Sequence, residues 1–285
     1  MTILHILVLA VIQGAAELLP VSSSAHVIVA EKLLGLDPAR PEMTLLLVLL
    51  HTGTMFAVLV SYWKAWKQVF FTSGRASLRF AGQLAVATAL TGVIGLGLKV
   101  FIEKVAMGGV PHAEVESLFG NLSLISGALA VAGCLILISG LRLQRQGPGT
   151  RPVNLRGACW MGVVQALCLP FRGFSRSGAT ISTGLLLDLE RRGTEAFSFA
   201  LAVLLTPVIV AKEVLRLLHA EQGMPRAQMV HLVAPGLLGM VLAFLAGMAA
   251  LRWLSKWLEE GRWHLFGVYC LGASAVVFFL SWSGW

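Results

Sequence analysis

A short polar segment interrupts an apolar stretch of the chain, where residues 13–26 read QGAAELLPVSSSAH. Gln13 and Glu17 are four residues apart, so they share one face of a short helix before Pro20. Three serines follow that are good N-caps for a second helix: Ser22, Ser23 and Ser24. His26 lies in the first turn of that helix. Because helix N-termini attract anions and ionisable residues inside apolar segments are usually functional, the segment predicts an anion site containing Glu17.

A second polar segment, residues 171–180, reads FRGFSRSGAT and has the groups that bind phosphate. Arg176 can present a planar fork to two phosphate oxygens, and Arg172 adds a second guanidinium. Gly173 and Gly178 allow the backbone to approach a ligand closely. Three hydroxyls add hydrogen-bond donors: Ser175, Ser177 and Thr180. Two arginines within a Ser/Gly turn favour a phosphate site over side chains that only reach toward lipid headgroups.

The elements that must position these segments belong to a membrane protein. Of the 285 residues, 57% are hydrophobic and 13% charged, and the mean hydropathy is +0.81. The net charge of +8 comes from basic residues in short loops between apolar segments, which is typical of membrane orientation and excludes nucleic acid as the expected partner. The four cysteines lie singly in apolar surroundings, so neither a disulfide framework nor a metal cluster is expected.

Six apolar segments reach the roughly 20 residues that a helix needs to cross a bilayer core. They cover residues 43–63, 80–102, 118–141, 196–218, 229–251 and 263–282. Two further apolar segments, 2–30 and 157–189, are broken midway by polar residues, Gly and Pro. Broken backbone at membrane depth must be surrounded by protein or a water-filled cavity, so each is predicted to be a re-entrant helix pair. The predicted fold is an all-α integral membrane protein with about six transmembrane helices and two re-entrant pairs.

The loop charges predict which side of the membrane each loop faces. Thirteen Lys and Arg residues fall in loops on one side, within residues 64–79, 142–156, 191–192 and 252–262. The loops of the other side hold four: Lys32, Arg40, Lys104 and Arg226. Because cytoplasmic loops carry the excess of basic residues, the first set is expected in the cytoplasm. The first re-entrant pair then enters from the outer face and the second from the cytoplasmic face.

The order of segments repeats along the chain, since one broken segment followed by three spans occurs twice. Three spans are an odd number, so the repeat is inverted. We therefore expect a single membrane domain, 1–285, with repeat units of about 1–141 and 157–285 joined by a basic cytoplasmic loop, 142–156. A shift of 152 positions places Gln13 on Gln165 and Ser23 on Ser175. Paired broken segments in inverted repeats predict that the two polar clusters face each other near the bilayer midplane.

Both clusters resemble the signature motifs of the undecaprenyl pyrophosphate phosphatase family of the bacitracin-resistance type. The first motif is matched by Gln13, Glu17, Pro20, Val21, Ser22, Ser23 and His26, and the second by Gly173, Ser175, Arg176, Ser177 and Thr180. Segment order and the stretch HTGTMFAVLVSYW are also similar, so the resemblance covers nearly the whole chain. Two positions depart from the family pattern: Arg172 replaces a proline, and Cys270 follows Tyr269 where the family tends to have arginine.

The resemblance implies hydrolysis of the terminal phosphate of a polyprenyl diphosphate lipid in the bacterial plasma (inner) membrane, which returns the monophosphate carrier used in cell-wall synthesis. Arg176 is expected to stabilise charge, and Glu17 to act as general base or, with Gln13, as ligand to a divalent cation, Mg²⁺ or Ca²⁺. The nucleophile stays open between Ser23 activated by His26, His26 itself and a water molecule. Further substrate contacts are expected from Ser22, Ser24, Arg172, Gly173, Ser175, Ser177 and Thr180.

Two other functions fit parts of the pattern. A transporter or flippase of polyprenyl phosphate would use the same phosphate site, since inverted repeats with broken helices are a transport architecture. A non-catalytic membrane scaffold leaves both polar clusters unexplained. The sequence leaves two further points open: the role of His51, which lies beside Thr52 and Thr54 within a span, and assembly into a homo-oligomer.

Overall fold

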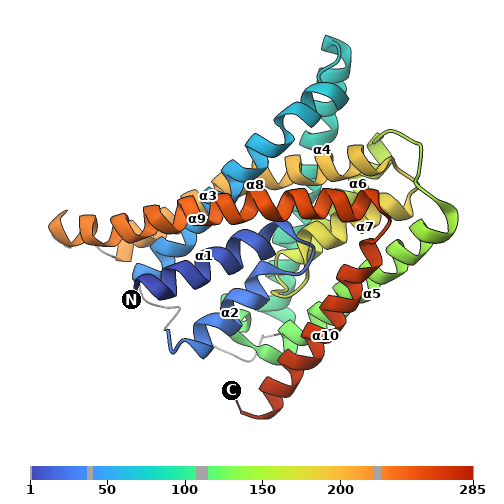
Figure 1. The fold of residues 1–285 in the computed structure, drawn as a ribbon. Coiled ribbons are helices and arrows are strands. Elements are labelled where there is room, and N and C mark those ends of the chain that lie inside the picture. Colours follow the sequence, from blue (N-terminus) through green and yellow to red (C-terminus); the bar gives the residue numbers. More distant parts are fainter. Residues whose placement is uncertain (1, 37–40, 107–114, 221–225, 285) are drawn as a thin grey trace.

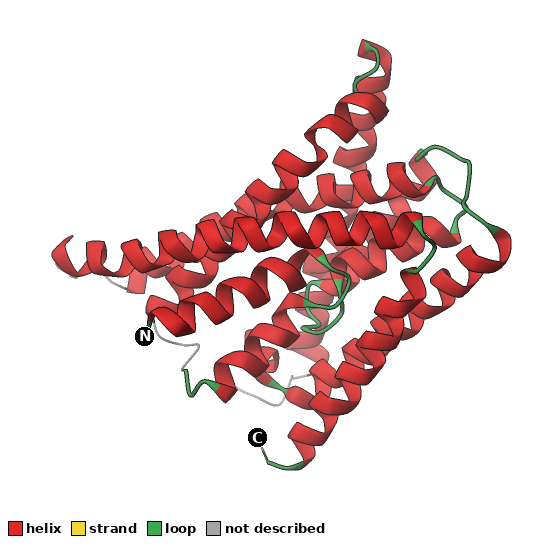
Figure 2. Cartoon of the chain, in the orientation of Figure 1, coloured by secondary structure: helices red, strands yellow, loops and turns green. Residues whose placement is uncertain are grey.

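The computed structural model describes residues 2–36, 41–106, 115–220 and 226–284, which form a helical bundle joined by short loops (Figures 1 and 2). The elements in chain order are α1 (Ile3–Leu18), α2 (Ser23–Leu33), α3 (Pro41–Val69), α4 (Gly74–Phe101), η1 (Ile102–Ala106), η2 (Val115–Gly120), α5 (Leu122–Gln146), α6 (Leu155–Cys168), α7 (Arg176–Leu186), α8 (Arg191–Ala220), α9 (Arg226–Glu259) and α10 (Trp263–Trp282). The described part of the chain contains no named strand, so the all-α prediction is confirmed.

Two helix pairs are interrupted midway, as the sequence predicts. Helix α1 has 16 residues, about 24 Å of helix, which is shorter than the roughly 30 Å bilayer core. It ends just before Pro20, which cannot continue a helix, and α2 begins three residues after that proline. Helices α6 and α7, of 14 and 11 residues, are separated by a loop that contains Pro170 and Gly173. Neither pair contains an unbroken helix of spanning length.

The long helices supply the membrane spans. Among the described residues, five helical stretches are long and apolar enough to cross a membrane: Leu45–Val69, Gly74–Val105, Leu122–Gln146, Ala234–Glu259 and Trp263–Trp282. Each overlaps a predicted span. The sixth predicted span, 196–218, lies in α8, a helix of 30 residues with Pro207 inside it; its passage through the membrane stays a prediction. The chain is therefore an all-α, multi-pass integral membrane protein.

Helices from the two halves of the chain pack in matching pairs. Helix α1 packs against α9 and α6 against α4, while α5 pairs with α10 and α3 with α8. Glycines allow the first two contacts: a Cβ on Gly14 would lie 2.7 Å from the carbonyl oxygen of Ala243, and one on Gly162 would lie 2.4 Å from that of Ala87. In an inverted repeat, helices at the same place in the two units contact partners that are also at the same place, as α1 does with α9 and α6 with α4. The division into units 1–141 and 157–285 stays a prediction.

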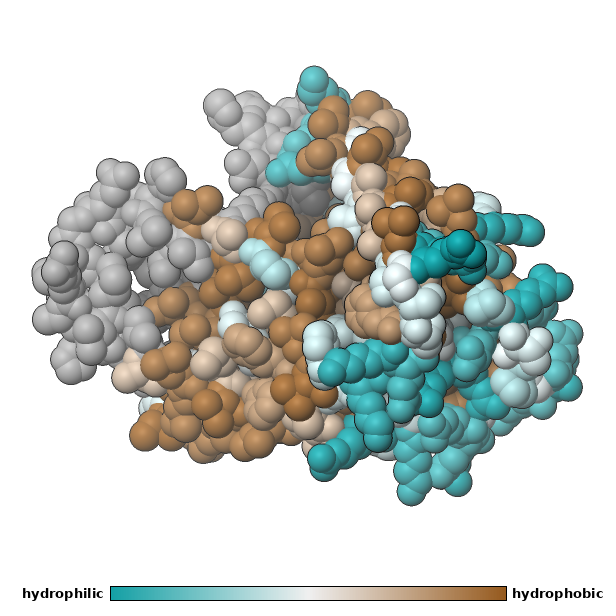
Figure 3. Space-filling view, turned by 90° about the horizontal axis from the view of Figure 1, so that it is seen from above, coloured by the Kyte–Doolittle hydropathy of each residue, from teal (hydrophilic) through white to brown (hydrophobic). Residues whose placement is uncertain are grey.

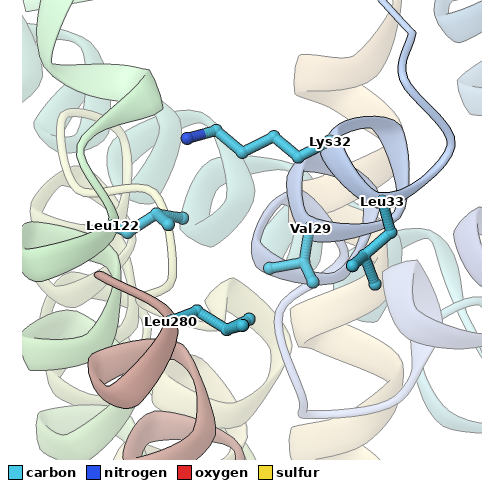
Figure 4. Close-up of a pocket in the computed structure, with 5 residues that line it drawn as sticks. All are labelled: Val29, Lys32, Leu33, Leu122 and Leu280. Atoms are coloured by element: carbon cyan, nitrogen blue, oxygen red, sulfur yellow. The ribbon is translucent and has the colours of Figure 1, made fainter. Parts of the chain in front are cut away.

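The molecular surface separates apolar and polar regions. Figure 3 shows hydrophilic side chains gathered toward one side of the face in view, whereas apolar side chains cover much of the remainder. Large apolar side chains project outward from long helices, as Val93 and Phe279 do at 72% and 64% exposure, which suits contact with lipid. A small pocket between α2, α5 and α10 is lined by Val29, Leu33, Leu122 and Leu280, and Lys32 extends across it (Figure 4).

Candidate active site

The two loops that interrupt the helix pairs, residues 19–22 and 169–175, meet inside the bundle (Figure 2). The Ser177 hydroxyl donates to the carbonyl oxygen of Leu19 over 3.2 Å. The Gly173 N–H donates to the Ser24 hydroxyl over 3.5 Å. Segments about 150 residues apart in sequence are thus joined at one place, and the prediction that the two polar clusters face each other is confirmed.

The first loop has an unusual backbone conformation. Leu19 is extended because the ring of Pro20 disfavours helical backbone in the preceding residue. Ser22 has φ +68°, a region that non-glycine residues rarely occupy and that is often found at functional sites. Its side chain does not cap α2, so the first N–H groups of α2 are left for other partners. Cys270 donates its thiol to the Pro20 carbonyl over 3.3 Å and ties the loop to α10.

The second loop depends on one glycine. Gly173 has φ +99°, and a Cβ on this residue would lie 2.5 Å from the carbonyl oxygen of Ile125 on α5. Only glycine satisfies both conditions without displacing the backbone. Two residues later, the Ser175 side chain caps α7 by accepting the N–H of Gly178 over 3.2 Å. The loop therefore fixes where α7 begins and places Arg176 at the first position of that helix.

The carboxylate of Glu17 is the point at which both polar clusters meet. Its Oε1 accepts a hydrogen bond from Arg176 Nη2 at 2.8 Å. Its Oε2 accepts hydrogen bonds from the Ser23 hydroxyl at 2.5 Å and the Gln13 amide at 3.1 Å. The Gln13 and Glu17 pair spans one helical turn, as the spacing predicts. The Glu17 side chain is 16% exposed, so this charged group is held by specific partners rather than by bulk water.

Two helix N-termini point their first residues at this carboxylate. Ser23 opens α2 and Arg176 opens α7, and each contacts a different oxygen of Glu17. Each helix has 11 residues. The partial positive charge of a helix N-terminus attracts anions, and here two such termini converge with a guanidinium and two hydroxyl-bearing loops. The arrangement suits a phosphate group placed against Arg176 and beside Ser23.

His51 also faces Glu17, although the sequence left its role open. Its Nε2 lies 3.7 Å from Glu17 Oε2, and its Nδ1 lies 2.8 Å from the carbonyl oxygen of Leu47. The sequence signal that could have found it was a titratable side chain inside an apolar span, which is costly unless it has a partner. Thr52 and Thr54 donate instead to backbone oxygens of their own helix, at 2.8 Å and 2.9 Å.

His26 lies at a different position from the one that a Ser23–His26 pair requires. Its Nδ1 lies 2.7 Å from the carbonyl oxygen of Ser22, and its Nε2 lies 2.7 Å from the hydroxyl of Tyr269 on α10. The two rings stack with centroids 5.7 Å apart. Both ring nitrogens therefore have partners other than Ser23, whose hydroxyl is directed to Glu17. Tyr269 was not among the expected site residues.

The remaining predicted residues contact neighbouring parts of the bundle. Ser22 and Ser24 pair through their hydroxyls at 3.3 Å. Thr180 donates to the Arg176 carbonyl and pairs with Ser198 on α8 at 2.6 Å, which ties α7 to α8. Arg172 lies over the ring of Phe119, with its guanidinium carbon 4.4 Å from the ring centroid. Arg176, rather than Arg172, supplies the guanidinium that is paired with Glu17 at the meeting point.

The side chains around Glu17 include few ligands for a divalent cation. Within the described ranges, no group of three or more His, Cys, Asp or Glu side chains is placed to hold a metal ion. Glu17 offers one carboxylate, and Gln13, which is buried and donates its amide nitrogen to Glu17, carries an amide oxygen of the kind that Mg²⁺ accepts. Mg²⁺ in proteins usually keeps several waters and takes further ligands from substrate phosphates. The two residues therefore fit a cation that binds together with a diphosphate, not a preformed metal cage.

Comparison with known proteins places the chain in one family. A family model described as "Bacitracin resistance protein BacA" matches residues 6–276. "Undecaprenyl-diphosphatase 2" of Acinetobacter baylyi is 55% identical over 284 residues, which is 99% of each chain. "Undecaprenyl-diphosphatase" of Desulfosudis oleivorans is 33% identical, with 92% of this chain and 93% of the relative covered, and that of Rhodopirellula baltica is 30% identical, with 98% of each covered. The chain therefore belongs to the BacA family of bacitracin resistance proteins.

Proposed function

We propose that this chain hydrolyses undecaprenyl diphosphate to undecaprenyl phosphate and inorganic phosphate. The relatives named undecaprenyl-diphosphatase extend over nearly its whole length, and the family is associated by name with bacitracin resistance. The observation that carries the proposal is the carboxylate of Glu17, held between the guanidinium of Arg176 and the hydroxyl of Ser23. Phosphoryl transfer needs a nucleophile, a base and a cation in one place, and these three groups supply them.

Arg176 is the residue that is proposed to bind the transferred phosphate. In the described structure one of its terminal nitrogens donates to Glu17 over 2.8 Å, and its side chain is 23% exposed, so further N–H donors remain accessible to a ligand. The N-termini of α2 and α7 add positive potential from both sides. Oxygens that gain negative charge during transfer are stabilised by such fixed donors.

Ser23 is the proposed nucleophile, with Glu17 as the base. The Ser23 hydroxyl donates to Glu17 Oε2 over 2.5 Å, so the carboxylate can accept the hydroxyl proton directly. Oγ attacks the terminal phosphorus, and the bond to the bridging oxygen breaks so that undecaprenyl phosphate departs with the electron pair. The departing phosphate takes the Ser23 proton from Glu17. Glu17 then accepts a proton from the water molecule that attacks the phosphoserine and returns it to Ser23 Oγ as the P–Oγ bond breaks and inorganic phosphate leaves. His26, whose two ring nitrogens lie at Ser22 and Tyr269, is proposed to shape the loop.

A divalent cation is proposed as the cofactor. Glu17 and the amide oxygen of Gln13 would hold it together with the diphosphate. When bound, Mg²⁺ or Ca²⁺ supplies positive charge against the phosphate oxygens.

The site is proposed to open to the outer side of the bacterial inner membrane. Support comes from the loop charges, thirteen basic residues against four, which direct the loop after α2 outward. Single cysteines at Ala39 and Gly74, in a chain without its four native cysteines, test this orientation with a membrane-impermeant thiol reagent on intact cells. We expect labelling at position 39, which lies outside the described residues, and none at position 74; the reverse pattern would overturn the orientation.

The activity is tested with purified protein in detergent. Incubation with undecaprenyl diphosphate is expected to release one inorganic phosphate per lipid and to leave undecaprenyl phosphate, detected by mass spectrometry. A transporter of polyprenyl phosphate would bind the lipid but release no phosphate, and no observation on this chain favours that alternative. Absence of phosphate release from correctly folded protein would refute the proposed hydrolysis.

A further inference from the structure

Two adjacent residues of α10 hold the first loop of the site by its backbone. The Cys270 thiol donates to the carbonyl oxygen of Pro20 over 3.3 Å. The Tyr269 hydroxyl lies 2.7 Å from Nε2 of His26, and Nδ1 of the same ring lies 2.7 Å from the carbonyl oxygen of Ser22. One short stretch of α10 thus reaches both ends of the segment 20–22, which leads directly into α2.

Helix α10 is itself held in place by α5. Gly267, two residues before Tyr269, packs so closely on α5 that a Cβ would lie 2.6 Å from the backbone nitrogen of Leu137. A Cβ on Gly133 of α5 would lie 3.1 Å from the Cβ of Cys270, which is fully buried. Because close-packed interiors transmit such constraints, the Tyr269 hydroxyl is fixed relative to the bundle.

The direction of each hydrogen bond from Tyr269 to the loop follows from the groups involved. A carbonyl oxygen only accepts, so His26 Nδ1 carries a proton and donates it to Ser22. In the neutral imidazole the other nitrogen, Nε2, is then an acceptor, so the Tyr269 hydroxyl donates to it. The two rings stack nearly parallel, with 12° between their planes. Tyr269 therefore favours the tautomer of His26 that can hold the Ser22 carbonyl.

The Ser22 backbone is the part of the loop that needs such support. Its φ of +68° costs a non-glycine residue free energy and persists only where neighbouring groups hold it. The Ser22 side chain does not cap α2 and pairs instead with the Ser24 hydroxyl at 3.3 Å. Ser23, whose hydroxyl donates to Glu17, follows directly. If the Ser22 backbone relaxed, the first turn of α2 would rotate and the Ser23 hydroxyl would move away from the carboxylate.

We propose that Tyr269 is a positioning residue that acts through His26 to hold the backbone from which the nucleophile, Ser23, is directed at its base. The Tyr269 hydroxyl orients the imidazole, and the imidazole holds the carbonyl of the residue before the nucleophile. A misplacement of about 1 Å at a reacting group can cost a large factor in rate, so this contact acts on turnover. The inference rests on the proposed phosphatase function and assigns a role to a residue outside both polar clusters.

The test removes the Tyr269 hydroxyl and keeps the ring. Tyr269→Phe can retain the stacking on His26, and the ring is half-exposed, so loss of one oxygen opens no buried cavity. Purified protein is assayed for phosphate release from undecaprenyl diphosphate over a range of lipid concentrations. We expect kcat to fall about 3- to 10-fold with little change in KM, because loss of one neutral hydrogen bond misplaces the nucleophile and leaves lipid binding intact. A higher KM with unchanged kcat would indicate a lipid contact and overturn the proposal.

A second background shows whether Tyr269 acts through His26. The shorter side chain of His26→Asn can offer an N–H to the Ser22 carbonyl but is too short to reach the Tyr269 hydroxyl. In this background Tyr269→Phe should change kcat by less than about twofold, because residues that act through one another have non-additive effects. An equal loss in both backgrounds would show that Tyr269 acts independently and would overturn the proposal. If His26→Asn does not fold or turn over, His26→Leu provides the same comparison.

Tyr62→Phe is the matched control, because Tyr62 is the other tyrosine of the chain. Its hydroxyl donates to Glu195 on α8, and it lies about 16 Å along α3 from His51, which faces the site. The same loss of a hydroxyl there should lower thermal stability and leave kcat within about twofold of wild type. A wild-type kcat in Tyr269→Phe would overturn the positioning role. Wild-type protein that releases no phosphate would instead refute the phosphatase function itself.

Discussion

Arg176→Lys is the substitution that most sharply tests how the site handles phosphate. Arg176 stands at the first position of α7 and donates one N–H to Glu17 over 2.8 Å. The planar guanidinium has further donors, so it can contact Glu17 and two phosphate oxygens in a fixed geometry. Lysine keeps the positive charge but concentrates it on a single ammonium group. The variant therefore retains attraction for phosphate and loses the fork.

The expected size of the effect follows from the hydrogen bonds that lysine cannot make. The ammonium cannot serve both Glu17 and a bidentate phosphate, so at least one charge-assisted hydrogen bond is missing in the transition state. Such a bond contributes about 1.5–3 kcal/mol, which corresponds to roughly 10- to 150-fold in rate. We expect kcat for phosphate release from undecaprenyl diphosphate to fall by this factor in purified protein at saturating lipid.

Arg142→Lys provides a matched control. Arg142 contacts both carboxylate oxygens of Asp188, at 3.0 Å and 3.2 Å, and the Leu186 carbonyl at 2.9 Å, at the far end of α7 from Arg176. At this position, the change from arginine to lysine removes the paired hydrogen bonds that join α5 to the end of α7. It should therefore lower thermal stability and leave kcat within about twofold of wild type. Equal kcat in wild type and Arg176→Lys would refute the reasoning and leave Arg176 with a structural role only.

Three further predictions concern other parts of the site. Ser23→Ala should lower kcat to below about a hundredth of wild type and abolish any phosphoserine trapped by rapid acid quench, whereas substantial turnover would point to water as the nucleophile. Gly173→Ala should lower both melting temperature and activity, because residue 173 has φ +99° and its Cβ would lie 2.5 Å from the Ile125 carbonyl oxygen. Gly97→Ala is the control: a Cβ on Gly97 in α4 meets open space, so this change should lower neither. Chelation with EDTA should reduce phosphate release at least tenfold and added Mg²⁺ or Ca²⁺ should restore it, whereas full activity without metal would remove the cation from the mechanism.

Much of the architecture could be predicted from the sequence because its signals are local or periodic. Pro20 ends α1, as helix-breaking preferences dictate. Helix α2 begins within the serine run, at Ser23, but the expected serine cap is wrong, because the Ser22 side chain makes no capping hydrogen bond. The two broken segments also indicated that their loops would meet, which the contact between Ser177 and Leu19 confirms.

Pairings between helices could not be predicted in the same way. Which side chain faces Glu17 depends on how each helix rotates about its axis when packed, and nothing near His51 in sequence specifies this. The partnership of His26 with Tyr269 joins residues 243 positions apart, and Arg172 in the second loop lies over Phe119 of η2. A motif identifies chemical groups, whereas packing decides which of them touch.

The most direct measurement of the central claim is the rate of phosphate release by Glu17→Gln relative to wild type. The amide is nearly isosteric and can still contact Ser23 and Arg176, so the protein should insert and fold, yet it cannot take a proton from the nucleophile. Removal of a general base typically costs roughly 10²–10⁴-fold, and we expect a loss in that range with undecaprenyl diphosphate as substrate. Retention of more than about a tenth of the wild-type rate would contradict the role of Glu17 as the base.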